Sequence, residues 1–373
     1  MGNCPPQLTM DIALHLPINR VSFGQVSTVL LRTLFERDKA GDKHNIFLFP
    51  IGQIDLSSQT GNSEEFVAWI KEKMQNGLEN YDRSIPLFKL WHINGSLESL
   101  AQRQTLLTFY ELDEPTKVEI NTTRNNTTYF SSQYSCDVFR KSGLETGYIP
   151  LAFDSRNFRV TNQKPIDDRI VFNLCGKWEK RKHHEKVLQA WIKRFGGDGK
   201  YSLQCAVFNP FMNEEQNKQA VFNALKGNKP FNVNFYPMMN ENSVYNEFLN
   251  SANIILGMSG AEGFGLPEFQ SIALGKHAVI LNAHAYKDWV TPESAVLVNP
   301  LPDKIPAYDG MFFQKGQMFN QGNIYDFNED EFIAACEKAV SRVESNKVNT
   351  KGLELQSIYT PDKFTDGVLS ITK

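Results

Sequence analysis

Short apolar segments alternate with amphipathic segments along most of the chain, and this alternation limits the fold more than any other feature. The apolar segment 11–18 is followed by residues 25–38, in which Val26, Leu30 and Leu34 recur at helical spacing. Further apolar segments of strand length lie at 45–51, 87–93, 105–112, 169–176, 201–208, 253–259 and 278–282. Because strands that alternate with helices are typical of parallel sheets, the sequence predicts an α/β fold.

A proline-containing stretch with little periodicity, residues 151–168, divides the alternation into two series. We therefore predict two Rossmann-like, doubly wound domains, 1–150 and 169–350, joined by this linker, a division that suits a chain of 373 residues. Residues 351–373 are expected to form a helical segment that packs back toward the N-terminal domain. Ligands of doubly wound sheets bind outside the carboxyl ends of the strands, so the site is expected in a central cleft between the domains.

Charge and cysteine content narrow the classes of partner and compartment. The formal net charge of -3 provides no basic field for binding nucleic acid by counterion release, so a nucleic-acid partner is not indicated. The five cysteines form no close pair and no CxxC, a pattern that favours neither a zinc site nor a disulfide framework. No segment has the roughly 20 consecutive apolar residues that a membrane-spanning helix needs. We therefore expect a cytoplasmic protein with no transmembrane segment.

The stretch 259–280, SGAEGFGLPEFQSIALGKHAVI, combines a glycine-rich turn with the start of a helix. It follows an apolar strand segment, and Pro267 suits the first position of a helix. The backbone around Gly263 and Gly265 would then lie at a helix N-terminus, where an anion or a polyhydroxylated ligand can approach closely. A tight turn that merely requires glycine explains the same residues equally well.

A second stretch, GKWEKRKHHEKVLQAW, places two cations at the end of another strand segment. Lys177 directly follows Gly176, and Lys182 precedes the next helix, so both cations could converge where the strand ends at the cleft. The other cations of this run are interpreted as solvated surface: Lys180, Arg181 and Lys186.

Together and in this order, the two stretches resemble motifs of the retaining GT-B glycosyltransferases of the large sucrose-synthase and mannosyltransferase family (glycosyltransferase family 4-like, group 1). Lys177 and Lys182 stand where that family has the Arg and Lys of its Gly-Arg…Lys-Gly motif, and His183 stands where Gly is common. The stretch that begins at Glu262 matches the family's Glu-Gly-Phe-Gly-Leu-Pro almost letter for letter. The resemblance is strong over about 170–300 and diffuse in the N-terminal half.

The resemblance implies a GT-B fold and a retaining, metal-independent glycosyltransferase without a cofactor. A nucleotide-diphosphate sugar donor would be held by the C-terminal domain, and an acceptor, which could be a glycan, lipid, protein or modified nucleobase, mainly by the N-terminal one. Lys177 and Lys182 would neutralise the leaving diphosphate, and Glu262 would accept hydrogen bonds from the donor sugar. The implied donor-binding residues are Gly176, Ser259, Gly263, Phe264, Gly265, Leu266 and Gln270.

Two departures from the family pattern keep a second function open. Gln270 replaces the second glutamate of the family signature, which usually binds the nucleotide ribose, and Tyr110 replaces a histidine that many relatives hold against the donor sugar. The alternative is a non-transferring GT-B protein, such as a nucleotide-sugar epimerase or an inactive sugar-nucleotide-binding protein. Candidate N-terminal residues facing donor or acceptor are Ser22, Phe23, Gly24, His92 and Tyr110.

Overall fold

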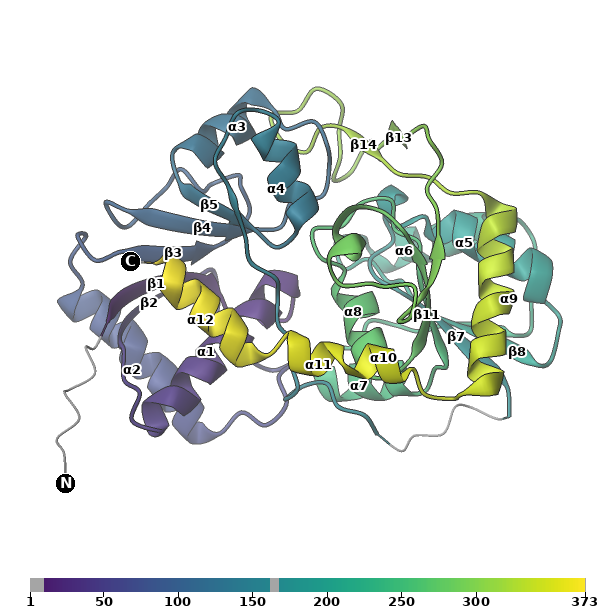
Figure 1. Cartoon of the computed structure of the whole chain (residues 1–373), viewed down its shortest axis with the longest axis horizontal. Helices are drawn as coiled ribbons and strands as arrows, with labels where there is room; N and C mark the ends of the chain where they lie inside the picture. The colour runs from purple at the N-terminus through teal and green to yellow at the C-terminus, as the bar shows by residue number, and fades with distance from the viewer. Residues whose placement is uncertain (1–9, 162–167, 373) are drawn as a thin grey trace.

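The computed structural model describes residues 10–161 and 168–372, which form two lobes around two parallel sheets (Figure 1). The sheet of the N-terminal lobe has the strand order β2-β1-β3-β4-β5-β6, and the sheet of the C-terminal lobe has the order β12-β11-β10-β7-β8-β9. Every pairing within these two sheets is parallel. The predicted α/β fold with two doubly wound sheets is therefore confirmed.

The N-terminal lobe contains the first half of the chain and the last helix. Its strands are β1 Asp11–Pro17, β2 Asn45–Ile51, β3 Leu87–Leu90, β4 Gln104–Thr108, β5 Thr127–Phe130 and β6 Gly147–Tyr148. Its helices are α1 Ser22–Lys39, α2 Glu64–Asn80, α3 Lys117–Arg124, α4 Gln133–Arg140 and α12 Pro361–Ile371. Helix α12, drawn in yellow in Figure 1, crosses to this lobe and packs beside α1, where Arg37 pairs with Asp362 and Asp366 at 2.9 and 2.7 Å.

The C-terminal lobe repeats the same alternation. Its strands are β7 Ile170–Cys175, β8 Tyr201–Ala206, β9 Val233–Phe235, β10 Ile254–Gly257, β11 His277–Leu281 and β12 Val296–Val298. Its helices are α5 His184–Phe195, α6 Glu214–Leu225, α7 Asn242–Asn250, α8 Leu266–Ala273, α9 Glu329–Ser345, α10 Thr350–Leu353 and α11 Leu355–Ile358, with 3-10 turns η1 Lys180–Lys182 and η2 His284–Asp288.

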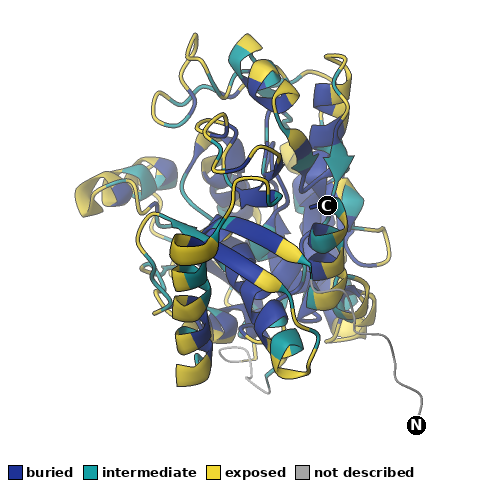
Figure 2. Ribbon diagram, turned by 90° about the vertical axis from the view of Figure 1, so that its left-hand side faces the viewer, coloured by how far each residue is buried: buried dark blue, intermediate teal, exposed yellow. Residues whose placement is uncertain are grey.

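Burial explains why the strand segments are apolar almost throughout. Helices cover both faces of each parallel sheet, so side chains of both orientations are removed from water. In β1, for example, Ile12, Ala13, Leu14 and Leu16 are fully buried. Figure 2 shows the same contrast, with buried strands in the interior and helices whose outer sides are exposed. No helix among the described residues is long and apolar enough to cross a membrane.

A long connection between β12 and α9, the 299–327 segment, contacts both lobes and contains the antiparallel pair β13 Ile305–Pro306 and β14 Asn323–Ile324 (Figure 1). On the N-terminal lobe, Asp113 pairs with Lys304 at 2.8 Å. On the C-terminal lobe, the Lys180 ammonium donates to the carbonyl of Pro306 at 2.6 Å. This segment lacks the periodicity that revealed the other elements, and its role as a bridge was not predicted.

Candidate functional site

The site forms where the carboxyl ends of β7 and β10 in the C-terminal lobe face the carboxyl end of β4 in the N-terminal lobe. Gly176 follows β7 with φ of 109°, and a Cβ there would lie 3.2 Å from the Lys182 ammonium nitrogen. Glycine at this position therefore leaves room for the buried Lys182 side chain. His183 has φ of 55°, the left-handed conformation that favours glycine, and its ring nitrogen Nε2 donates to the Tyr325 carbonyl at 2.7 Å.

Lys182 and Glu262, two of the predicted catalytic residues, form an ion pair inside this site. Both side chains are almost completely buried, and the second carboxylate oxygen of Glu262 lies 3.0 Å from Arg181. Burial opposes ionisation of Glu262, but the positive charges of Arg181 and Lys182 hold the pKa of this carboxyl well below its ordinary value. Glu262 is therefore an anion at neutral pH that two cations hold in place.

Arg181 was predicted to lie on a solvated surface, and that interpretation is wrong, because its exposed fraction is only 5%. The 3-10 turn η1 directs Lys180 outward and turns Arg181 and Lys182 into the protein. Besides Glu262, the Arg181 guanidinium contacts Glu179 at 2.8 Å and Glu111 at 3.2 Å. A buried guanidinium needs such carboxylate partners because its desolvation is costly.

Lys177, the third predicted catalytic residue, lies at the open side of this network. Its ammonium is 2.7 Å from Glu179, and its side chain remains 37% exposed. The ammonium also lies over the rings of Phe211 and Phe312, at 5.1 and 4.8 Å from their centres. The continuous chain of contacts from Lys177 through Glu179 and Arg181 to Glu262 thus connects the two predicted motifs.

Glu268, on the first turn of α8, is a buried carboxyl next to this network. Burial raises its pKa to about 7, the negative charge of Glu262 acts in the same direction, and Lys182 acts against both. Between pH 4.5, the ordinary pKa of a glutamate, and about pH 7, Glu268 therefore holds a proton in the folded protein that it has released in the unfolded chain. Stability must fall as pH rises through this window, because the native state holds more protons.

We expect Glu268→Gln to remove this pH dependence. The free energy of unfolding of the wild type should fall more between pH 5 and pH 7.5 than that of the variant, by up to about 3 kcal/mol, since one pKa unit corresponds to about 1.4 kcal/mol. Urea unfolding at both pH values measures the difference. Glu185→Gln, which makes the same change at an exposed carboxylate on α5, is the control and should leave the wild-type slope intact. Parallel slopes for wild type and Glu268→Gln would contradict the assignment.

The glycine-rich turn after β10 is covered by the protein itself. A Cβ on Gly263 would lie 2.8 Å from the Cβ of Phe109 in the N-terminal lobe. A Cβ on Gly265 would lie 2.4 Å from the Tyr286 ring, and one on Gly260 2.2 Å from the Tyr325 carbonyl oxygen. Each glycine therefore permits a close contact that any larger residue would block.

Gly263→Ala should destabilise the protein by about 1–3 kcal/mol, the usual cost of forcing an extra carbon into a packed site. The new methyl group would press on Phe109 across the lobe interface, where the Ser131 hydroxyl also donates to the Gly263 carbonyl at 2.8 Å. Thermal unfolding measures the loss. Gly199→Ala is the matched control, because a Cβ there meets nothing within 4 Å. Equal melting temperatures for the two variants would show that Phe109 moves aside at no cost in stability, and would contradict the prediction.

Comparison with known proteins adds a structural relationship. No protein-family model matches the sequence, and no curated protein matches it. The fold is similar to that of sucrose-phosphate synthase (tll1590) from Thermosynechococcus elongatus, with a TM-score of 0.65 at 14% identity over 97% of this chain and 98% of that one. A glycosyltransferase from Rickettsia africae ESF-5 gives a TM-score of 0.66 at 11% identity over 98% of both chains. Anabaena Alr3699/HepE in complex with UDP-glucose gives a TM-score of 0.61 at 12% identity over 97% of this chain and 98% of that one.

The chain has the GT-B fold. The ion network of Lys177, Arg181 and Glu262 lies where the two lobes meet, because Arg181 also contacts Glu111 of the N-terminal lobe at 3.2 Å. At 11–14% identity this likeness concerns the fold alone.

On the N-terminal side of the GT-B cleft, an aromatic group faces the ion network. The Phe23 ring stacks on Phe109 at 4.1 Å and lies 4.4 Å from the His92 ring. The His92 side chain reaches solvent, but much of the space around it is filled by protein. This partial desolvation and the positive charge of Lys177 lower the pKa of His92 to about 4. His92 is therefore neutral at pH 7 and could accept or donate a hydrogen bond in the cleft.

The other N-terminal candidates have different surroundings. Ser22 is exposed in the first turn of α1. Gly24 is buried, and a Cβ there would lie 2.2 Å from the Asn19 carbonyl oxygen, so this position requires glycine. Tyr110 is buried in the lobe, where its hydroxyl donates to Glu119 at 3.4 Å. The neighbouring residue Glu111 is the one that contacts the ion network.

The remaining donor-side candidates lie on the loop after β10 and on α8. The Ser259 hydroxyl donates to the carbonyl of Ala261 at 3.0 Å, and the Phe264 carbonyl accepts from the Trp289 indole at 3.0 Å. Leu266 begins α8, and Gln270 lies one turn further along it with a mostly buried side chain. These residues shape the loop that carries Glu262.

Sequence reasoning missed Glu111, Glu179 and Arg181. Glu179 and Arg181 alternate with lysines in a run whose charge suggests a surface, so only their burial reveals their role. Glu111 was detectable in principle, because a carboxylate just beyond the carboxyl end of a parallel strand lies at the edge where doubly wound folds bind ligands.

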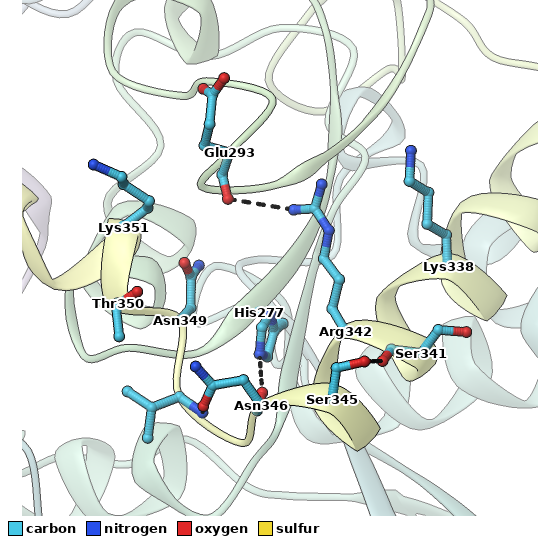
Figure 3. A pocket seen from close by; sticks show the side chains of 11 residues that line it. His277, Glu293, Lys338, Ser341, Arg342, Ser345, Asn346, Asn349, Thr350 and Lys351 are labelled. Carbon is cyan, nitrogen blue, oxygen red and sulfur yellow. Dashed lines mark hydrogen bonds between the residues drawn. The ribbon is translucent and has the colours of Figure 1, made fainter.

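One hollow borders the ion network and another lies apart from it. A cavity of about 540 Å³ borders η1 and is lined by Trp178, Glu179 and Phe312 among others. A depression of about 370 Å³ includes His277, the first residue of β11, and side chains of α9 and α10 (Figure 3). Arg342 lines this depression and donates to the Pro292 carbonyl at 2.8 Å. Because it lies at the amino end of the strands, it is separate from the candidate site.

Proposed function

We propose that this protein is a retaining, metal-independent glycosyltransferase that moves a sugar from a nucleotide-diphosphate donor to an acceptor. The observation that carries the proposal is the buried pair of Lys182 and Glu262 at the cleft, joined to Lys177 through Arg181 and Glu179. This arrangement offers cations for a leaving diphosphate and a carboxylate for sugar hydroxyls in one place. The solved complex of HepE with UDP-glucose supports a nucleotide-sugar donor for this fold.

In the proposed reaction, the bond between the anomeric carbon and the diphosphate oxygen breaks, and the diphosphate leaves with the electron pair. An acceptor hydroxyl oxygen forms the new bond on the same face of the sugar, and its proton passes to the leaving phosphate oxygen. Lys177 and Lys182 offset the charge that develops on the diphosphate, a kind of stabilisation that is often the largest catalytic contribution. Glu262 accepts hydrogen bonds from the donor sugar.

The proposal also assigns roles to Gln270 and to the N-terminal lobe. Gln270, on the mostly buried side of α8, contacts the nucleotide ribose. Its amide accepts one hydrogen bond from the ribose hydroxyls and donates another, whereas a carboxylate would accept two. The acceptor lies on the N-terminal side of the cleft near Phe23 and His92. Neither a metal ion nor a cofactor is required in this proposal, because the cations at the cleft supply positive charge where a divalent ion would otherwise act.

A thermal-shift screen with nucleoside diphosphates and their sugars, in the presence of EDTA, tests the proposal. A ligand at 100 times its Kd stabilises the native state by about 2.7 kcal/mol, so one nucleotide should raise Tm by several degrees. No shift with any nucleotide would overturn the donor assignment, and a strict, restorable requirement for Mg²⁺ or Mn²⁺ would overturn metal independence. Binding without release of the sugar would favour the non-transferring alternative.

A further inference from the structure

Arg181 connects carboxylates from three separate parts of the chain. Its NH2 group is 3.2 Å from Glu111, which follows β4 in the N-terminal lobe. Its Nε is 2.8 Å from Glu179 in the connection between β7 and α5, and its NH1 is 3.0 Å from Glu262 in the loop after β10. The same NH1 group donates to the Ala261 carbonyl at 2.7 Å. One planar guanidinium thus joins the N-terminal lobe to the carboxylate proposed to bind the donor sugar.

The geometry of these contacts fixes the orientation of Glu262. A guanidinium is planar and rigid, so ion pairs on two of its edges, together with the hydrogen bond from NH1 to the Ala261 carbonyl, determine where its remaining edge points. Glu111 and Glu179 are the partners on those two edges, and Glu262 meets the remaining edge with one oxygen while Lys182 takes the other. Loss of Glu111 would remove the contact from the opposite lobe, so the remaining partners, Glu179 and the Ala261 carbonyl, would set a different tilt of Arg181, and Glu262 would turn with it.

We propose that Arg181 is a positioning residue that, through its contact with Glu111, holds Glu262 in the orientation that binds the donor sugar when the two lobes are together. This inference rests on the proposed function and goes beyond it, since it makes sugar binding depend on a residue of the opposite lobe. The nucleotide part of the donor, which Glu262 does not contact, should be insensitive to Glu111.

The first test compares variants of the full-length protein on a nucleotide-sugar donor identified by the thermal-shift screen. Glu111→Gln and Arg181→Lys should each lower kcat about tenfold or more, while the Kd for the matching nucleoside diphosphate stays within about twofold, because the interaction acts on the sugar in the transition state. Asp113→Asn is the matched control, since it removes another ion pair near the lobe interface, with Lys304 at 2.8 Å, without contacting Glu262. An equal loss in the control would show that any weakened interface suffices, and would overturn the inference.

A double-mutant cycle then tests whether Glu111 acts through Glu262. The kcat loss caused by Glu111→Gln should shrink to less than about twofold in a Glu262→Gln background, because residues that act as one unit are not additive. Additive losses, or a parallel loss of nucleoside-diphosphate affinity, would overturn the inference while leaving the proposed function intact. Absence of turnover by the wild type with every donor would instead overturn the proposed function, and this inference with it.

Discussion

Glu262→Gln is expected to lower kcat by at least about 100-fold, a loss comparable to removal of one strong transition-state contact. Glutamine keeps the shape of the side chain but removes the negative charge that Arg181 and Lys182 neutralise. It also replaces one acceptor oxygen with an amide donor, which cannot accept a bond from a sugar hydroxyl. The two cations would then be left in a buried site with one carboxylate fewer.

Loss of the Glu262 charge should also lower the free energy of unfolding. Breaking a buried ion pair by removing one partner costs about 3–5 kcal/mol, and the amide of Gln recovers part of this through hydrogen bonds. Urea unfolding together with steady-state kinetics measures both effects. Glu185→Gln, at an exposed carboxylate in the first turn of α5, should leave both quantities near wild type. Wild-type kcat in Glu262→Gln would remove Glu262 from the reaction.

Lys182→Met is expected to have the second largest effect, because it removes a buried cation while keeping most of the side-chain volume. Glu262 and Glu268 both face this ammonium, so the substitution leaves two carboxyls with less compensation and raises the pKa of each. We expect kcat to fall about 100-fold and nucleoside-diphosphate affinity to fall about tenfold or more, since charge-assisted contacts contribute about 1.5–3 kcal/mol.

The control for this prediction lies two residues away. Lys180→Met removes an exposed cation that donates to the backbone carbonyls of Pro306 and Tyr308 in the 299–327 segment. Calorimetric titration with the nucleoside diphosphate and measurement of kcat should show near-wild-type values for this variant. If Lys180→Met and Lys182→Met behaved alike, the effect would reflect net charge, and the specific role of Lys182 would be wrong.

The fold could be predicted from the sequence because strands buried on both faces of a parallel sheet appear as short apolar segments. The segment 45–51 is apolar from Ile46 onward, and strand β2 was found where this segment predicted it. The ends of several strands fall earlier than the apolar segments suggested: β4 ends at Thr108, whereas its segment extends to 112. Residues 109–112 remain apolar or aromatic in part because Phe109 packs on Gly263 and Tyr110 fills the lobe interior.

The sequence was less informative about the site. It identified Lys182 and Glu262 by their motifs, but contact between Arg181 and Glu111 depends on how two lobes meet, and no local pattern records that. The backbone around Gly263 and Gly265 was predicted either to admit a ligand or to form a tight turn that needs glycine, and side chains of this protein lie close to both positions. Close approach by protein and close approach by a ligand require the same absence of a Cβ, so sequence alone could not separate the two.

The central claim is tested most directly by following the reaction itself. Wild-type protein is incubated, in EDTA, with the nucleotide sugar that gives the largest thermal shift and a panel of acceptors, and proton NMR follows the anomeric signals of donor and product. The account predicts release of the nucleoside diphosphate and a product with the same anomeric configuration as the donor. An inverted product would contradict the retaining mechanism, and binding of the donor with no release across the panel would contradict transfer.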